Sequence, residues 1–221
     1  MRIKHLGHAS FVITTSSGTR ILTDPYSTEA YADKLLYSPI EELVDVVTVS
    51  HGHGDHGDPK ALVALPGAPV IIKSSGKFLA NGVEFLGVET FHDDSHGGER
   101  GKNVVFVINA DDLCIAHLGD LGHVLTADQA AEIGAVDVVL VPVGGFYTID
   151  ARQATKVVDQ LGARVVIPMH YRTRKCLFPI AHVEEFLAGK ENVVRAGTSE
   201  LDVTKDSLPT ERQVVVLDQA L

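Results

Sequence analysis

The chain has 221 residues, of which 45% are hydrophobic and 22% charged, a composition typical of a globular protein with a sizeable core. Its formal net charge of −10 argues against long nucleic acid as a partner, because nucleic-acid-binding proteins usually carry a basic face. No apolar run approaches the ~18 residues that a membrane-spanning helix needs, and no secretory leader pattern is present. Cys114 and Cys176 form no Cys-x-x-Cys pair. We therefore expect a cytoplasmic protein with free thiols and no membrane partner.

The first half of the chain is dominated by predicted strands. Residues 10–15 and 19–23 are rich in β-formers and flank Ser16-Ser17-Gly18, which predicts a hairpin. The apolar run 45–49 predicts a buried strand that leads directly to His51. Asp58 and Pro59 are typical of a helix start and predict a short helix over 60–65. Further strands are predicted at 70–73, 83–91, 103–109 and 113–118, with a turn at 111–112 between the last two.

Strands and helices alternate in the second half. Thr126 and Gly134 are a suitable N-cap and stop for a helix over 126–133. We also predict strands at 136–141, 164–168 and 212–217, and helices at 151–161 and 180–187. No linker or composition break divides the chain, so we expect one domain over 1–221 in which two β-sheets pack together with helices outside. Several strand ends then meet at one edge, where loops can carry chemistry.

The most distinctive motif is SHGHGDHGDP at residues 50–59, which contains His51, His53, Asp55 and His56. Imidazole nitrogens and carboxylate oxygens are ligands of zinc-class metals. The intervening glycines allow these side chains to turn inward on a tight, irregular path, unlike the helical His-Glu-x-x-His arrangement. Four ligands could hold one ion, but the adjacent Asp55 and His56 more naturally serve a second ion beside it.

More candidate ligands follow later predicted strands. They are His92 or His96 after 83–91, Asp120 after 113–118, and His170 after 164–168. A lone histidine at a strand end is more often structural than a ligand. The shared placement of these residues at strand exits strengthens the prediction for all of them.

The motif His51-x-His53-x-Asp55-His56 after an apolar strand, with His, Asp and His at later strand ends, resembles the metallo-β-lactamase superfamily over essentially the whole chain. GHASF at 7–11, TDP at 23–25, HLGDLGH at 117–123, VPVGG at 141–145 and IPMHY at 167–171 narrow the resemblance. Together they resemble a branch of uncharacterised metal-dependent hydrolases that includes the L-ascorbate-6-phosphate lactonases. The resemblance implies the α/β (α+β) class and a four-layer αββα sandwich.

Carried over residue by residue, the resemblance implies two divalent ions per chain. His51, His53 and His92 would bind the first ion, Asp55, His56 and His170 the second, and Asp120 would bridge both. Zn²⁺ is the first expectation, and Mn²⁺, Fe²⁺ or Ni²⁺ suit the same ligand atoms. His96 is the alternative to His92; we prefer His92 because it directly leaves the predicted strand.

Other side chains are candidates for contacts with the ligands or with the substrate. Asp24, and less so Asp45, could accept a hydrogen bond from a ligand imidazole, although each could simply cap a turn. His8 and His123 could face the site or be buried and structural, and Tyr171 could contact the substrate or pack in the core. The cations nearest to the ligand loops in sequence are Arg100, Lys102, Arg172 and Lys175.

These residues predict a metal-dependent hydrolase. Two ions ~3.5–4 Å apart can hold a hydroxide at neutral pH, and this hydroxide would attack an ester-like bond, a lactone or a phosphodiester, in a small anionic molecule. Asp55 and Asp120 would help orient the hydroxide. Residues 121–169 are too few for the large inserted domain of nuclease members. A redox enzyme and a non-catalytic metal-binding or sensor protein remain alternatives, and a homo-oligomer is compatible with this branch.

Overall fold

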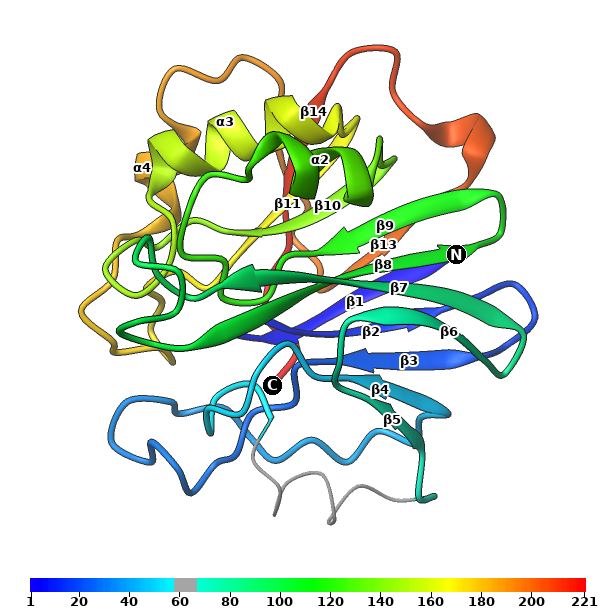
Figure 1. The fold of residues 1–221 in the computed structure, drawn as a ribbon, viewed down its shortest axis with the longest axis horizontal. Helices are drawn as coiled ribbons and strands as arrows, with labels where there is room; N and C mark the ends of the chain where they lie inside the picture. Colours follow the sequence, from blue (N-terminus) through cyan, green and yellow to red (C-terminus); the bar gives the residue numbers. More distant parts are fainter. Residues whose placement is uncertain (58–66) are drawn as a thin grey trace.

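Two β-sheets pack face to face in the computed structural model, which describes residues 1–57 and 67–221 (Figure 1). The six-stranded sheet has the order β13-β1-β2-β3-β4-β5. Its strands are β1 (Arg2–Gly7), β2 (Ser10–Thr14), β3 (Arg20–Thr23), β4 (Val46–Thr48), β5 (Val70–Ile72) and β13 (Glu200–Asp202). The predicted hairpin is the antiparallel pair β2–β3. The helix predicted over 60–65 lies outside the described residues.

The eight-stranded sheet has the order β12-β14-β11-β10-β9-β8-β7-β6. Its strands are β6 (Gly76–Ala80), β7 (Val83–Phe91), β8 (Lys102–Ala110), β9 (Leu113–His117), β10 (Val138–Pro142), β11 (Val165–Met169), β12 (Val193–Arg195) and β14 (Gln213–Val216). Between the two sheets lies one apolar core, in which Phe11, Phe85 and Phe106 are among the largest fully buried side chains. Burial of these inward faces is the main force that holds the two sheets together.

Helices cover the outer face of the eight-stranded sheet. They are α2 (Ala127–Ile133), α3 (Ala151–Leu161) and α4 (Val183–Leu187), and a second apolar cluster lies beneath them. Thr126 and Asp150 cap α2 and α3 with side-chain hydrogen bonds to the backbone N–H groups of Gln129 and Gln153. The outer face of the six-stranded sheet packs on the segment around Val44. The predicted packing of two β-sheets with helices outside is confirmed.

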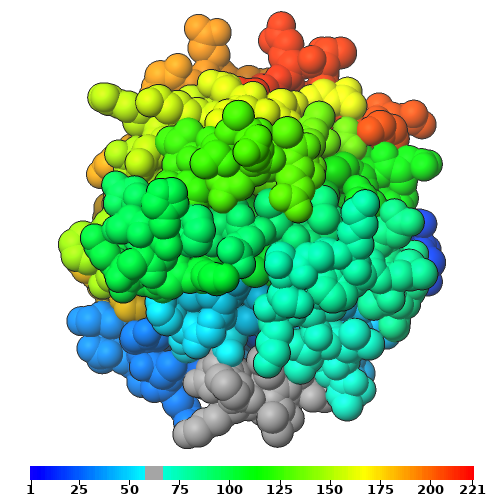
Figure 2. All heavy atoms as spheres, in the orientation of Figure 1, coloured from blue at the N-terminus to red at the C-terminus, as the bar shows by residue number. Residues whose placement is uncertain are grey.

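The carboxyl ends of many strands meet at one edge. Strand β3 runs parallel to β4, and β9, β10 and β11 run parallel to one another. Strand β7 runs in the same direction as β9, because each is antiparallel to β8 between them. The loops that follow these strands gather on the left of Figure 1, and in Figure 2 the green side chains after β7 lie above the blue ones after β3. The predicted convergence of strand ends at one edge is therefore present.

The structure differs from the predicted elements mainly at the sheet margins. Strands β1, β6, β12 and β13 were not predicted, and the last two are three residues long with exposed faces. The helix predicted over 180–187 begins only at Val183, because Ala181 donates its backbone N–H to Gly144 and accepts one from Arg172. Across 1–57 and 67–221, each helix is too short or too polar to cross a membrane.

Candidate metal centre

The loop after β4 folds into a tight turn that gathers three histidine rings. The backbone N–H groups of His56 and Gly57 both donate to the carbonyl of His53, at 3.0 and 2.9 Å. The ring centroid of His51 lies 4.6 Å from those of both His53 and His56. The Nε2 of His51 and the Nδ1 of His53 face each other at 3.0 Å. Two ring nitrogens that converge in this way can be shared by one cation.

Three further candidate ligands reach the same point from the ends of β7, β9 and β11. His92 follows β7, Asp120 follows β9, and His170 follows β11. The approach is close: a Cβ on Gly119 would lie 2.4 Å from Asn103 Oδ1, and one on Gly122 would lie 2.2 Å from the carbonyl carbon of His92. Only glycine fits at these two positions, which explains the HLGDLGH sequence around Asp120.

Asp120 lies at the centre of the cluster, and its two carboxylate oxygens face different histidines. Oδ2 lies 3.1 Å from the Nε2 of His92 and 3.7 Å from the Nε2 of His51. Oδ1 lies 3.0 Å from the Nε2 of His56 and 3.4 Å from the Nε2 of His170. The carboxylate thus stands between two groups of imidazoles. This geometry suits a bridge between two cations.

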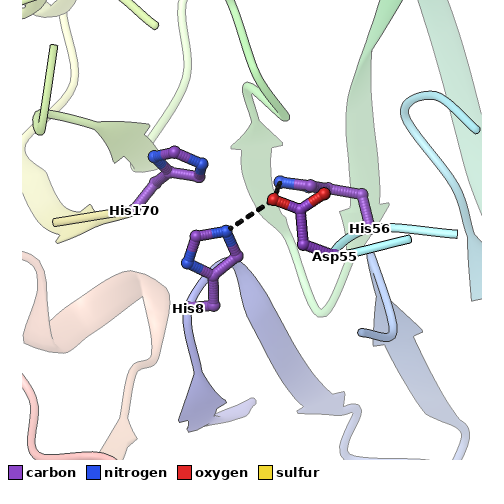
Figure 3. Close-up of side chains that lie close together, drawn as sticks. All are labelled: His8, Asp55, His56 and His170. Carbon is purple, nitrogen blue, oxygen red and sulfur yellow. Dashed lines mark hydrogen bonds and ion pairs between the residues drawn. The ribbon is translucent and has the colours of Figure 1, made fainter. Parts of the chain in front are cut away.

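The described residues contain three groups of possible ligand atoms, each with its atoms within 4.8 Å of one another. Two of them contain the histidines that face Asp120: the first group is His51, His53 and His92, and the second is His8, Asp55, His56 and His170. The third is Asp24, His51 and His56. Figure 3 shows the second group, in which Nε2 of His8 donates a hydrogen bond to Oδ2 of Asp55 at 3.2 Å. Apart from His8, the first two groups match the two ligand sets implied by the resemblance.

Asp24 orients His56, a member of the second group, through a hydrogen bond from the ring nitrogen that faces away from Asp120. Its Oδ2 accepts hydrogen bonds from Ser50 Oγ at 2.6 Å and from His56 Nδ1 at 2.8 Å, and its Oδ1 accepts one from the Ser50 backbone at 2.7 Å. Because His56 donates to Asp24 through Nδ1, its Nε2 is directed toward Asp120. This is the carboxylate–histidine arrangement that orients metal ligands. Asp45 instead accepts the backbone N–H of Arg20, so it ties the start of β3 to the residue before β4.

Buried polar atoms without partners in the cluster are consistent with a metal site. Within the part of the chain that the structure describes, the buried Nδ1 atoms of His92 and His170 have no hydrogen-bond partner. The Nε2 of His56 and the Oδ1 of Asp120 are also buried, and they meet at 3.0 Å without the geometry of a hydrogen bond. Unpaired buried polar atoms are costly and rare. A cation between the histidine rings and Asp120 would satisfy the Nε2 of His56 and the Oδ1 of Asp120.

The electrostatics of the cluster also favour cations. Burial lowers the pKa of His51 and of His170 to about 3, so both rings are neutral at pH 7 and keep the lone pair that a metal requires. Burial alone would raise the pKa of Asp120, but His170 and His56 hold it well below its ordinary value. Burial opposes protonation of His56, yet Asp120 and Asp55 raise its pKa well above the usual range. The centre therefore stabilises positive charge.

A cavity of about 210 Å³ opens onto the cluster. Its lining comprises Tyr31, His53, Asp55, His92, Arg100, Asp120, Tyr147, His170 and Phe178. A larger groove of about 630 Å³ lies at α3, α4 and β14, but it is lined by none of the candidate ligands. The smaller cavity is therefore the candidate substrate site.

Several other residues singled out in the sequence lie away from this cavity. His96 is exposed and packs edge-on against Phe91. His123 accepts a hydrogen bond from the Phe91 backbone at 3.2 Å, which supports the end of β7. Tyr171 is buried in the outer apolar cluster instead of facing substrate. Of the four cations, Arg100 lines the cavity, whereas the exposed Lys102 pairs with Glu89.

Some contributors were not predicted from the sequence. Tyr31, Tyr147 and Phe178 line the cavity, and Asn103 accepts the backbone N–H of Asp120 at 3.0 Å. A partial signal existed for Tyr147, because GGFYT at 144–148 begins shortly after the strand predicted over 136–141. The other aromatic residues lie in irregular segments where spacing carries no periodic signal.

Comparisons with known proteins agree with this geometry. Residues 2–170 match the β-lactamase superfamily domain. The chain is 31% identical over 195 residues to the UPF0173 metal-dependent hydrolase of Pyrococcus horikoshii, covering 78% of this chain and 85% of that protein. It is 34% identical over 200 residues, with the same coverage, to the one of Carboxydothermus hydrogenoformans.

A solved structure from Thermotoga maritima, assigned to the zinc-dependent hydrolases of the metallo-β-lactamase superfamily, is similar over 98% of this chain and 97% of its own, with 40% identity and a TM-score of 0.79. The family match covers more than half of the chain, and the relatives span most of its length. The chain therefore belongs to the UPF0173 metal-dependent hydrolases of the metallo-β-lactamase superfamily.

Proposed function

We propose that the chain is a dinuclear hydrolase that cleaves an ester-like bond, a lactone or a phosphodiester, in a small anionic substrate. The observation that carries this proposal is the placement of Asp120, whose two oxygens face different histidine groups. His51, His53 and His92 would hold one ion, and Asp55, His56 and His170 the other. Zn²⁺ is the first candidate, and Mn²⁺, Fe²⁺ or Ni²⁺ suit the same nitrogen and oxygen ligands.

The chemistry divides between the ions and the protein. A bound divalent pair supplies Lewis acidity and makes hydroxide available at neutral pH. Asp55 and Asp120 both line the cavity and both have a pKa below the ordinary value, so each is ionised and can accept a hydrogen bond from the nucleophile. Asp24 keeps the His56 ring in one orientation during the reaction. Arg100, in the same cavity, can bind a negatively charged part of the substrate.

Two measurements on one preparation test the proposal. Elemental analysis of protein purified without chelator should give two metal ions per chain. The same preparation should hydrolyse members of a panel of lactones, thioesters and phosphodiesters, and removal of metal should abolish this activity. A single ion with no second site on titration would exclude the dinuclear form. Two ions without any hydrolysis would favour a metal-binding or sensor protein.

A further inference from the structure

Besides the candidate ligands, the cavity is lined by three aromatic rings and a guanidinium. Phe178 is buried, and Tyr31 and Tyr147 pack edge-on against it at centroid distances of 5.3 and 5.8 Å. The Arg100 guanidinium lies 6.0 Å from the centroid of the Tyr147 ring. These four side chains, which we call the aromatic–arginine wall, come from four different loops.

Arg100 is held in place by an unusual loop. The buried carboxylate of Asp93 accepts hydrogen bonds from the backbone N–H groups of Ser95, Gly97, Glu99 and Arg100, at 2.7 to 3.0 Å. These four bonds fix the chain between His92 and β8 as one closed turn. Arg100 is thus presented beside a candidate ligand loop on a preorganised backbone, which reduces the entropy lost when it binds a ligand.

The guanidinium is available for a ligand. Its ion pair with Glu99 is 3.5 Å long, and the Glu99 side chain is 61% exposed, so water screens this contact. Among the described residues that line the cavity, Arg100 is the one that carries a permanent positive charge. An anionic group in the cavity would find its complementary partner there.

The rings indicate the shape of the rest of the substrate. Flat aromatic side chains pack best against flat apolar or aromatic groups. The turn that carries Tyr147 holds Phe146 at a φ of 62°, a left-handed conformation that bulky residues rarely adopt. Such backbone strain is often associated with functional positions. The volume of about 210 Å³ is below the ~300–1,000 Å³ of typical small-molecule sites, so the substrate is small.

We infer that the aromatic–arginine wall selects small substrates in which a flat apolar group carries one anionic group, with Arg100 binding the anion and Tyr147 and Phe178 packing on the flat group. This inference rests on the proposed hydrolytic function of the same cavity. It assigns selectivity to residues that hold no metal, so the two can be tested separately.

A matched pair of esters isolates the role of the charge. Phenyl acetate and 4-acetoxybenzoate have the same scissile bond and ring, and differ in one carboxylate. Each consumes one water and gives acetate and a phenol. We expect the metal-loaded protein to prefer 4-acetoxybenzoate by roughly 10-fold or more in kcat/KM, mainly through KM, as loss or gain of one charge-assisted hydrogen bond implies.

Three variants separate the contributions. Arg100→Gln should remove the preference, so that the ratio of kcat/KM for 4-acetoxybenzoate to that for phenyl acetate falls to about 1. Tyr147→Leu should raise KM for both esters alike. Lys102→Gln, a matched control two residues away whose side chain is 68% exposed, should change neither. A preference that survives in Arg100→Gln, or an equal loss on both esters, would overturn the inference.

A binding measurement distinguishes failure of this inference from failure of the proposed function. Calorimetric titration of the metal-loaded protein should detect benzoate but not its neutral counterpart benzamide, and Arg100→Gln should weaken benzoate at least roughly 10-fold. If wild type binds benzoate in this way but cleaves neither ester, the hydrolytic proposal fails for such bonds while the wall stands. If benzoate does not bind, or binds equally to Arg100→Gln, the wall is not the anion site.

Discussion

The Nε2 of His8 lies 3.2 Å from Oδ2 of Asp55, and the Nδ1 of the same ring lies 3.8 Å from the Sγ of Cys176. The buried His8 ring therefore contacts a candidate metal ligand through one nitrogen and a thiol through the other. Its φ is 53°, a left-handed conformation in which asparagine is tolerated. The ring thus orients the Asp55 carboxylate from a backbone position that can be kept in a variant.

His8→Asn should retain the backbone conformation but leave Asp55 without its hydrogen bond, because the shorter side chain cannot reach it. We expect affinity for one of the two ions to fall roughly 10- to 100-fold, the effect usual for residues that orient metal ligands. Competition with a fluorescent chelator measures both affinities. Cys176→Ala, which removes only the sulfur contact, should have a smaller effect, and unchanged affinity in His8→Asn would show that Asp55 needs no such support.

Asp24→Asn tests the support behind His56. The new amide would present a donor where Ser50 and His56 both donate, so the His56 ring should lose its fixed orientation. We expect metal affinity to fall by roughly 10- to 100-fold. Asp45→Asn makes the same chemical change at a position remote from the metal candidates and should leave metal content unchanged. Equal metal content in both variants would argue against a role for Asp24.

Comparing two alanine variants shows whether His92 or His96 is the metal ligand after β7. His92 is buried, and its Nε2 lies 3.1 Å from the Oδ2 of Asp120. His96 is exposed on the loop that follows. His92→Ala should lower the metal content, because one ligand of the first ion is lost. His96→Ala should retain two ions, and elemental analysis distinguishes the two variants. The reverse pattern would show that His96, four residues later, is the ligand instead of His92.

The sequence predicted the strands that lead to the candidate ligands better than it predicted the wall of the cavity, for a physical reason. His51, His92, Asp120 and His170 each follow a β-strand, and strand periodicity and apolar runs are local patterns. Strand β7 and helix α3 were accordingly predicted with the bounds that the structure shows. Tyr31 and Phe178 meet only through the tertiary fold, from irregular segments nearly 150 residues apart, so no local pattern could pair them.

Acidification should destabilise the protein through His5. This ring is buried and stacked on Phe11, and burial lowers its pKa from 6.5 to about 4. The folded state therefore binds fewer protons than the unfolded state between these values. Above pH 6.5 the neutral His5 ring costs the folded state nothing. As the pH falls toward 4, the free energy of unfolding decreases, by at most about 3 kcal/mol.

Urea unfolding of metal-free protein at pH 7 and pH 4.5 measures this effect. His5→Gln keeps a hydrogen-bond donor toward the His8 carbonyl but cannot be protonated. We expect the variant to be less stable at pH 7, because ring packing is lost, yet to lose less stability on acidification than the wild type. Parallel losses in the two proteins would show that His5 does not contribute to acid sensitivity.

Asp120→Asn is the sharpest test of the centre, because both groups of histidines converge on this one side chain. The change keeps the size of the side chain but removes its negative charge and replaces one oxygen with a poor metal ligand. Hydrolysis should fall by at least ~10²-fold, the order seen when a major electrostatic element of a site is lost. Metal content should drop, while circular dichroism remains that of the wild type, since the Asp120 side chain contributes little to the apolar core. Asp94→Asn, the same change at an exposed position beside His92, should leave both properties intact. Full metal content with near-normal hydrolysis in Asp120→Asn would contradict the bridging role and reduce Asp120 to a residue of the turn after β9.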